Sequence, residues 1–262
     1  MTDRIREYHR PSDVADALAL LKRSTVRTVP IASAPRVPAE PYAGAQAVVD
    51  LSQLHLSYVA ETGSAVRLGA HTSLQDLVTY PRFKTFAGGV LSQAAYLAAH
   101  PGLRQLATVG GALTAPDGPP EMLLALLALQ AAVVTQGAEL RETPLAGSVP
   151  ADTELIVEVK FSLAATGGAL ARVGRTPLDA AIVAVVAVVD ASGAGRAAVA
   201  GASAQPFVHQ WAAGTKPEQI AEAVQARANP AADYRGSAEY RQAMAGVLAR
   251  RAAERAMMND ER

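Results

Sequence analysis

Cysteine is absent from this sequence of 262 residues. The absence excludes disulfide bridges, thiolate nucleophiles, zinc fingers and iron–sulfur clusters held by the chain itself. Any iron–sulfur cluster that works with this chain must therefore belong to another chain.

A net charge is absent too, because 24 lysines and arginines balance 24 aspartates and glutamates. The whole chain has no electrostatic attraction to nucleic acid or to an anionic membrane. The first eleven residues lack the apolar core of a signal peptide. The longest apolar stretch, residues 123–134, is interrupted by Gln130 and is shorter than the ~20 residues that a bilayer span needs. We expect a cytoplasmic protein without a nucleic-acid partner or a membrane span.

Several motifs of known chemistry are also missing. The sequence has no G-x-G-x-x-G fingerprint, no P-loop and no G-x-S-x-G elbow. Its five histidines are scattered and show no spacing that would place two of them on one helix face. A Rossmann dinucleotide site, a serine hydrolase of the elbow type and a histidine metal site are therefore not supported.

The hydrophobic content of 50% is ample for two modest domains. Apolar spacing and turn residues predict mixed helices and strands. The predicted helices cover residues 12–21, a short segment from Ser73, 86–99, 121–129, 217–227 and 237–259. The predicted strands cover residues 26–31, 47–51, 56–60, 65–68, 131–136, 139–143, 154–162, 169–173, 182–190 and 196–203. Three prolines predict a loop over residues 32–44.

The glycine pair Gly167-Gly168 is the best candidate for a domain boundary. The pattern before it closes on a strand, and the pattern after it opens a new β-rich series. We therefore predict one domain over residues 1–166 and a second over residues 167–262.

The most pointed candidate for a binding site is the run Thr108-Val109-Gly110-Gly111-Ala112. Two glycines let the backbone approach a ligand closely and present amide N–H groups to an anion such as a pyrophosphate. The same Gly-Gly turn also occurs as plain loop geometry, and this alternative stays open.

Two charged groups also have two interpretations each. In one interpretation, Asp117 and Glu121 are paired carboxylates that act on a cofactor or substrate. In the other, they form a solvated loop and helix cap. The arginines of the last predicted helix form a docking face for a partner, or else they are simply solvated: Arg241, Arg250, Arg251 and Arg255.

Read in order, several stretches resemble the medium subunit, or central domain, of the molybdenum hydroxylases, the xanthine and carbon monoxide dehydrogenase group. The nearest match is LRQLATVGGAL at residues 103–113, similar to the family's "vRNrgTiGGnL". Further matching runs are YHRPS at 8–12, VVDL at 48–51, LGAHT at 68–72, RVGR at 172–175, DAAIV at 179–183 and DYRGS at 233–237. The resemblance covers nearly the whole chain.

The resemblance implies an α+β fold. A two-lobed FAD-binding domain of the vanillyl-alcohol-oxidase-like type is followed by a C-terminal domain of antiparallel sheet plus helix. It also implies FAD as cofactor and no metal on this chain. Electrons would pass from a molybdopterin large subunit, through two [2Fe–2S] clusters on a small subunit, to the flavin and on to an acceptor.

The sequence departs from the family at the first of its two FAD loops. Family members have a run close to "AGGqSL" after the first strand, whereas this chain has no glycine there. Side chains block close approach to a phosphate, and Pro30 and Pro35 each remove an amide donor. The positions concerned are Ile31, Ala32, Ser33 and Ala34. In the second loop, Ala112 stands where Asn or Ser is common, and Glu121 replaces the usual aspartate.

Charge-assisted hydrogen bonds contribute roughly 1.5–3 kcal/mol each, so losing several of them weakens FAD binding or abolishes it. The sequence therefore leaves three functions open: an FAD-dependent electron-transfer subunit, an FAD-less structural scaffold of the same kind of complex, and a stand-alone ligand-binding protein on the same fold. No residue is predicted to be a catalytic acid, base or nucleophile.

Overall fold

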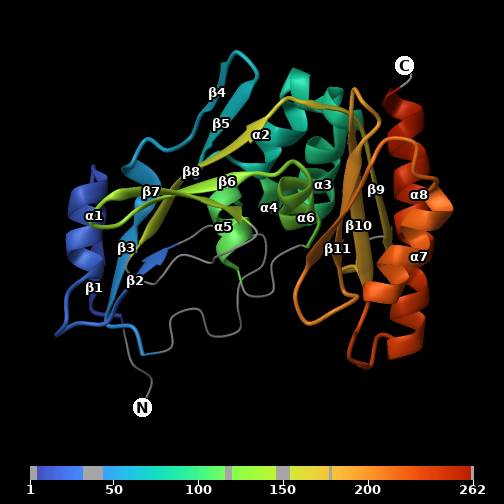
Figure 1. Cartoon of the computed structure of the whole chain (residues 1–262). Coiled ribbons are helices and arrows are strands. Elements are labelled where there is room, and N and C mark those ends of the chain that lie inside the picture. The colour runs from blue at the N-terminus through green and yellow to red at the C-terminus, as the bar shows by residue number, and fades with distance from the viewer. Residues whose placement is uncertain (1–4, 32–43, 116–119, 146–153, 177–178, 261–262) are drawn as a thin grey trace.

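The computed structural model describes residues 5–31, 44–115, 120–145, 154–176 and 179–260. It is an α+β protein, as the family resemblance implied, and it contains three sheets (Figure 1). Most of the predicted loop over residues 32–44 lies outside the described residues.

The first lobe is a small parallel sheet in the order β1-β3-β2, with one helix between its first two strands. Its elements are β1 (Glu7–His9), α1 (Val14–Leu21), β2 (Thr28–Ile31), β3 (Ala47–Asp50) and the 3₁₀ turn η1 (Leu51–Gln53). Helix α1 is capped by Asp13, whose side chain accepts a hydrogen bond from the Asp16 amide. The helix predicted over residues 12–21 thus begins two residues later, at Val14.

The second lobe is an antiparallel sheet in the order β4-β5-β8-β6-β7. Its strands are β4 (Val59–Thr62), β5 (Ala65–Gly69), β6 (Ala132–Gln136), β7 (Leu140–Pro144) and β8 (Leu155–Ser162). Short helices pack against it: α2 (Leu74–Thr79), η2 (Pro81–Lys84), η3 (Phe86–Gly89), α3 (Val90–Ala98), α4 (Pro101–Arg104), α5 (Val109–Thr114) and α6 (Pro120–Ala128).

The helix predicted over residues 86–99 is interrupted near its start. Ala87, Gly88 and Gly89 have positive φ angles of 47°, 62° and 76°, which no right-handed helix contains. The regular helix α3 therefore begins only at Val90.

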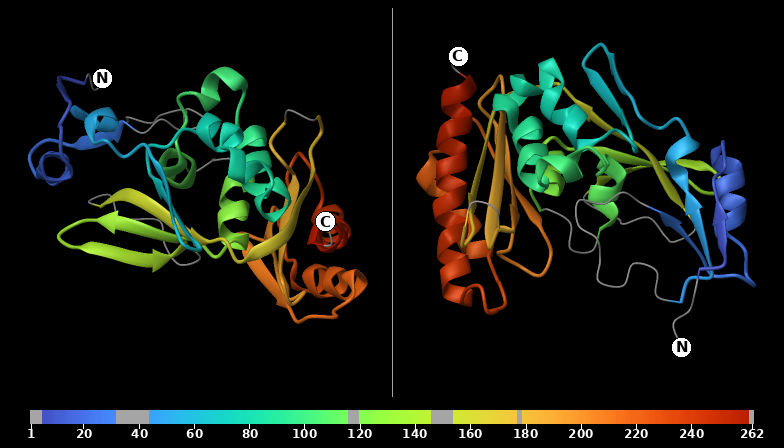
Figure 2. Two further views of the ribbon diagram at one scale, coloured as in Figure 1. Left: turned by 90° about the horizontal axis from the view of Figure 1, so that it is seen from above. Right: turned by 180° about the vertical axis from the view of Figure 1, so that it is seen from behind.

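The C-terminal part is an antiparallel sheet in the order β12-β11-β10-β9. Its strands are β9 (Ala165–Val173), β10 (Val183–Asp190), β11 (Gly195–Ala200) and β12 (Phe207–Trp211). Helices α7 (Pro217–Arg227) and α8 (Ala238–Asp260) cover one face of it, and the helices of the second lobe lie against the other (Figures 1 and 2).

Strand β10 is buried on both faces, which explains its unbroken apolar sequence. Val183, Val185 and Val189 pack with α7 and α8, whereas Val186 and Val188 join the core of the second lobe. The two parts of the chain thus share one core across this sheet.

The pair Gly167-Gly168 lies inside strand β9, and the chain passes from one sheet to the next at the turn over residues 163–164. A Cβ atom at Gly167 would collide with the backbone carbonyl of Ala256 on α8, and one at Gly168 with that of Ala87. The two glycines therefore allow three backbone segments to pack in direct contact. The division into residues 1–166 and 167–262 stays a prediction.

Candidate functional site

The predicted glycine turn is fixed to a neighbouring turn, residues 70–74, by backbone hydrogen bonds. The Leu74 amide donates to the Ala107 carbonyl at 2.8 Å, the Val109 amide to Thr72 at 3.0 Å, and the Gly110 amide to Ala70 at 2.8 Å. The site is thus built from two turns of the second lobe. The run LGAHT, part of the family resemblance, supplies the partner turn.

Thr108 begins helix α5 as its N-cap. Its hydroxyl accepts a hydrogen bond from the Gly111 amide at 3.1 Å, and its carbonyl accepts one from the Ala112 amide at 2.9 Å. Together with the bonds of Val109 and Gly110, four successive amides of the turn donate to atoms of the protein. One of the two interpretations of the sequence was that this turn presents its amides to an anion. In this arrangement the amides hold the turn in place.

Gly110 lies where a side chain would be tightly packed against the neighbouring turn. A Cβ atom there would lie 3.1 Å from the Ala70 carbonyl oxygen and 3.2 Å from the Ala70 Cβ. Because the Ala70 backbone is itself hydrogen-bonded to Val157, it has little freedom to move away. This glycine therefore serves the close approach of two turns.

Thr72, buried to 1% exposure, links the site to Tyr58, which directly precedes strand β4. Its hydroxyl donates to the Tyr58 carbonyl at 2.8 Å and accepts from the Tyr58 amide at 3.2 Å. The Tyr58 phenol donates to Glu158 at 2.7 Å; burial and this carboxylate raise the pKa of Tyr58 to about 12. The supporting shell of the turn is therefore a fully hydrogen-bonded network.

His71 lies in the same partner turn and is partly buried. Burial lowers the pKa of His71, and the nearby Asp50 carboxylate opposes that shift. Since Asp50 belongs to the first lobe, His71 lies towards the junction of the two lobes.

Glu121 belongs to α6, which contacts α5. Its side chain is buried and lies 3.2 Å from the guanidinium of Arg172 on β9. The interpretation of Glu121 as a solvated cap is therefore wrong. Asp117, its predicted companion, lies outside the described residues. The Glu121–Arg172 pair was not predicted, although Arg172 lies in a run that resembles the family.

The first predicted FAD loop is described only at its start. Ile31 is the last residue of β2 and pairs in register with Asp50 of β3. Ala32, Ser33 and Ala34 lie outside the described residues. The role of the two loops in binding remains a prediction.

The described residues fit FAD only in part. They provide a rigid glycine turn and a short helix α5, which Figure 1 shows between the first lobe and the C-terminal sheet. They do not provide free amides at positions 109–112. Across the described ranges, no group of three histidine or acidic residues is arranged to hold a metal ion. No helix among these ranges is long and apolar enough to cross a bilayer.

The sequence profile described as "FAD binding domain in molybdopterin dehydrogenase" matches residues 3–159, more than half of the chain. The carbon monoxide dehydrogenase medium chain of Afipia carboxidovorans is 29% identical over 286 residues, which cover 95% of this chain and 96% of that one. A structure of the Cu,Mo-CO dehydrogenase has a TM-score of 0.87 and 26% identity, covering 99% of this chain and 100% of that one.

Quinoline 2-oxidoreductase from Pseudomonas putida 86, at 19% identity and a TM-score of 0.85 with complete coverage of both chains, shows the same fold. The profile, the relative and the structure agree with the resemblance noted in the sequence, and they support FAD as the cofactor of this domain. The chain belongs to the family of FAD-binding domains of molybdopterin dehydrogenases, in the form of a medium subunit.

Proposed function

We propose that this chain is the medium subunit of a molybdenum-hydroxylase complex. It receives electrons from [2Fe–2S] clusters on a small subunit and passes them through FAD to an acceptor, while a large molybdopterin subunit oxidises the substrate. The observation that carries the proposal is the glycine turn fixed by Ala70 and Thr72. This turn lies in a chain whose alignment with a carbon monoxide dehydrogenase medium chain covers 95% of this chain and 96% of that one. The lack of cysteine agrees with clusters held by another subunit.

FAD, when bound, supplies a carrier that accepts and releases the electrons. The residues of this chain bind and orient it. Thr108 fixes the start of α5, and Gly110 brings the turn close to its neighbour. No residue of this chain is assigned a proton-transfer step.

We further propose that FAD is held less firmly here than a complete pair of glycine loops would hold it. The first loop has no glycine, and the amides of the second loop donate within the protein. These same observations favour the second candidate function, an FAD-less scaffold that holds the small and large subunits together.

The absorption spectrum of the purified complex, with the released flavin quantified, tests the cofactor. We expect less than one FAD per chain after purification, rising to one when FAD is added. One tightly held FAD per chain without addition would contradict the weak grip. No flavin at saturating FAD would establish the scaffold instead.

The iron and molybdenum contents of the material that co-purifies with the tagged chain test the subunit assignment. We expect both metals, together with a cysteine-rich chain. A tagged chain that elutes alone, without either metal, would contradict the assignment and favour the stand-alone ligand-binding protein.

A further inference from the structure

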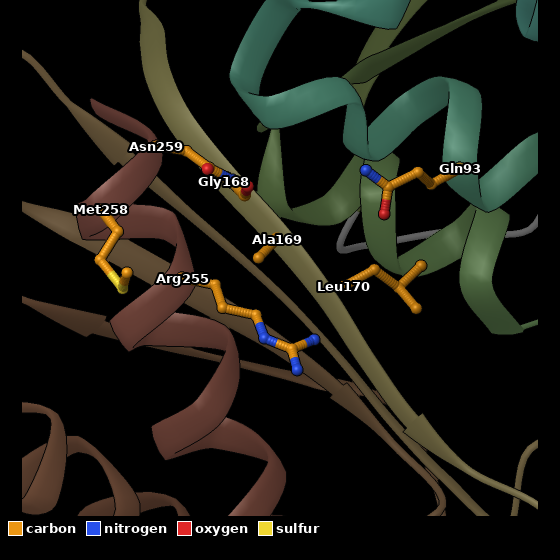
Figure 3. Close-up of a pocket in the computed structure, with 7 residues that line it drawn as sticks. All are labelled: Gln93, Gly168, Ala169, Leu170, Arg255, Met258 and Asn259. Carbon is orange, nitrogen blue, oxygen red and sulfur yellow. Dashed lines mark hydrogen bonds between the residues drawn. The ribbon is translucent and has the colours of Figure 1, made fainter. Parts of the chain in front are cut away.

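A groove runs along strand β9, between helix α3 on one side and helix α8 on the other. It has a volume of about 580 Å³ and continues into a smaller hollow of about 190 Å³. The two share Gln93, Leu170 and Arg255 (Figure 3). The groove is therefore elongated along the strand, and a compact ligand would fill only part of it.

One wall of the groove is the unpaired edge of the C-terminal sheet, because β9 is its last strand. The Val173 carbonyl accepts from the Ile182 amide and so faces β10. Peptide groups alternate in direction along a strand, so those of Arg172 and Leu170 face the groove. At Gly168 the edge is closed, since Asn259 donates to its carbonyl at 3.0 Å. The open edge therefore begins after Gly168 and runs to the end of the strand.

The groove is strongly cationic. Arg251 and Arg255 stand one turn apart on α8, both exposed, and Arg175 lies beyond the end of β9. Among the described residues that line the groove, none carries a carboxylate. Of the other arginines that line it, Arg172 is paired with Glu121 at 3.2 Å, and Arg175 lies 3.7 Å from Asp179. Two arginines at this spacing repel each other, whereas Arg250 on the same helix is paired with Glu254 at 2.8 Å.

The structure thus separates the four arginines that the sequence singled out. Arg241 is buried and donates to the carbonyls of Ile182 and Gly201. Arg250 is paired within its helix. Arg251 and Arg255 face the groove beside Leu170 and Leu248.

We propose that this groove receives an extended, acidic segment of a partner subunit, which adds to β9 as a further strand. Main-chain hydrogen bonds to the edge at Leu170 and Arg172 supply affinity, and acidic side chains pair with Arg251 and Arg255. A segment of about five residues, roughly 17 Å long at ~3.4 Å per residue, matches the open edge. The inference rests on the proposed function, because it requires a partner subunit.

Arginines beside an edge strand, such as Arg251 and Arg255 on α8, can also serve only to prevent aggregation. The experiment separates the two roles. The tagged chain is purified with its partners from the natural host, as wild type and as the double variant Arg251→Glu/Arg255→Glu. We expect the variant to retain at least tenfold less of the partner. The control variant Lys22→Glu/Lys216→Glu makes the same change of charge at two exposed sites away from the groove. Lys22 lies on the first lobe, and Lys216 follows β12, the strand at the opposite edge of the sheet. The control should retain partners as the wild type does.

Equal retention by the groove variant would overturn the inference and leave the proposed function intact. A wild-type chain that retains no partner would overturn both.

Because the chain has no cysteine, one introduced cysteine carries a photo-crosslinker at a unique position. Thr176→Cys places it at the end of the groove, and Ala213→Cys is the control beyond β12. We expect Thr176→Cys alone to crosslink to an acidic stretch of a partner subunit, identified by mass spectrometry. A crosslink to a segment without acidic residues, or none, would contradict the inference.

Discussion

The guanidinium of Arg172 lies 3.2 Å from the carboxylate of Glu121, and both side chains are largely buried. This ion pair joins strand β9 of the C-terminal sheet to helix α6 of the second lobe. Arg172 also donates to the carbonyl of Asp179, so the pair helps to fix the chain that follows β9.

Glu121→Gln should destabilise the protein by about 3 kcal/mol, because it leaves the Arg172 cation buried without its carboxylate. Urea denaturation followed by circular dichroism measures the loss. Arg250→Gln, which breaks the exposed pair with Glu254, should cost less than about 0.5 kcal/mol. Equal effects of the two variants would show that the buried pair is not special.

Gly110→Ala should destabilise the protein by about 1–3 kcal/mol, because its methyl group would be forced against Ala70. The same variant should bind FAD more weakly, which titration of flavin fluorescence measures. Gly102→Ala is the matched control, since a Cβ there meets nothing nearer than the His100 ring at 3.9 Å. The control should be neutral or gain up to about 1 kcal/mol. A stable Gly110→Ala variant with unchanged FAD affinity would refute the role given to this turn.

Ile31→Gly/Ala32→Gly should increase FAD affinity by at least tenfold, about 1.4 kcal/mol. The glycines remove side chains from the first loop and permit the dihedral angles that close approach to a phosphate needs. Calorimetric titration with FAD measures the change. Ile31→Ala/Ala32→Ser alters the same positions without adding glycine and should bind like the wild type. An unchanged affinity in the glycine variant would mean that this loop does not limit binding.

Stability should fall as the pH drops from 7 to 5, in part through His71. Burial lowers the pKa of His71 in the folded protein, so the unfolded chain takes up a proton first, near the ordinary pKa of about 6.5. The stability that this pKa difference contributes is present above that pH. It is lost as the pH falls through the pKa of His71 in the folded protein. Melting temperatures across this range should therefore vary less in His71→Asn than in the wild type. His55→Asn, at an exposed position, should reproduce the wild-type profile, and an equally steep profile in His71→Asn would remove His71 as the cause.

Local signals were enough to predict most helices and strands. A short helix was expected from Ser73, and in the structure Ser73 caps α2 through a capping box with Asp76. The apolar run of β10 was expected to be a strand. Strand β12 was missed, although Phe207, His209 and Trp211 alternate with smaller or polar residues over its five positions. β1 is only three residues long and gives too short a pattern.

The candidate site was less accessible to prediction. The sequence identified the glycine turn and the run that contains Ala70 and Thr72. It did not predict the hydrogen bonds between the two turns, because these bonds depend on tertiary packing. The pairing of Glu121 with Arg172 has the same origin. A Gly-Gly pair in a sequence is also compatible with two structural roles. Gly167-Gly168 was interpreted as a domain boundary, and in the structure it allows close packing of backbone segments.

That glycine contact has a further consequence. Gly88, Gly167 and Gly168 bring the backbones of η3, β9 and α8 together without side chains between them, and the core on one face of β10 belongs to the second lobe. Neither part of the chain can open without exposing the apolar surface of the other. Heat should therefore unfold the second lobe and the C-terminal part in one cooperative transition. For that transition the ratio of van 't Hoff to calorimetric enthalpy should be close to one.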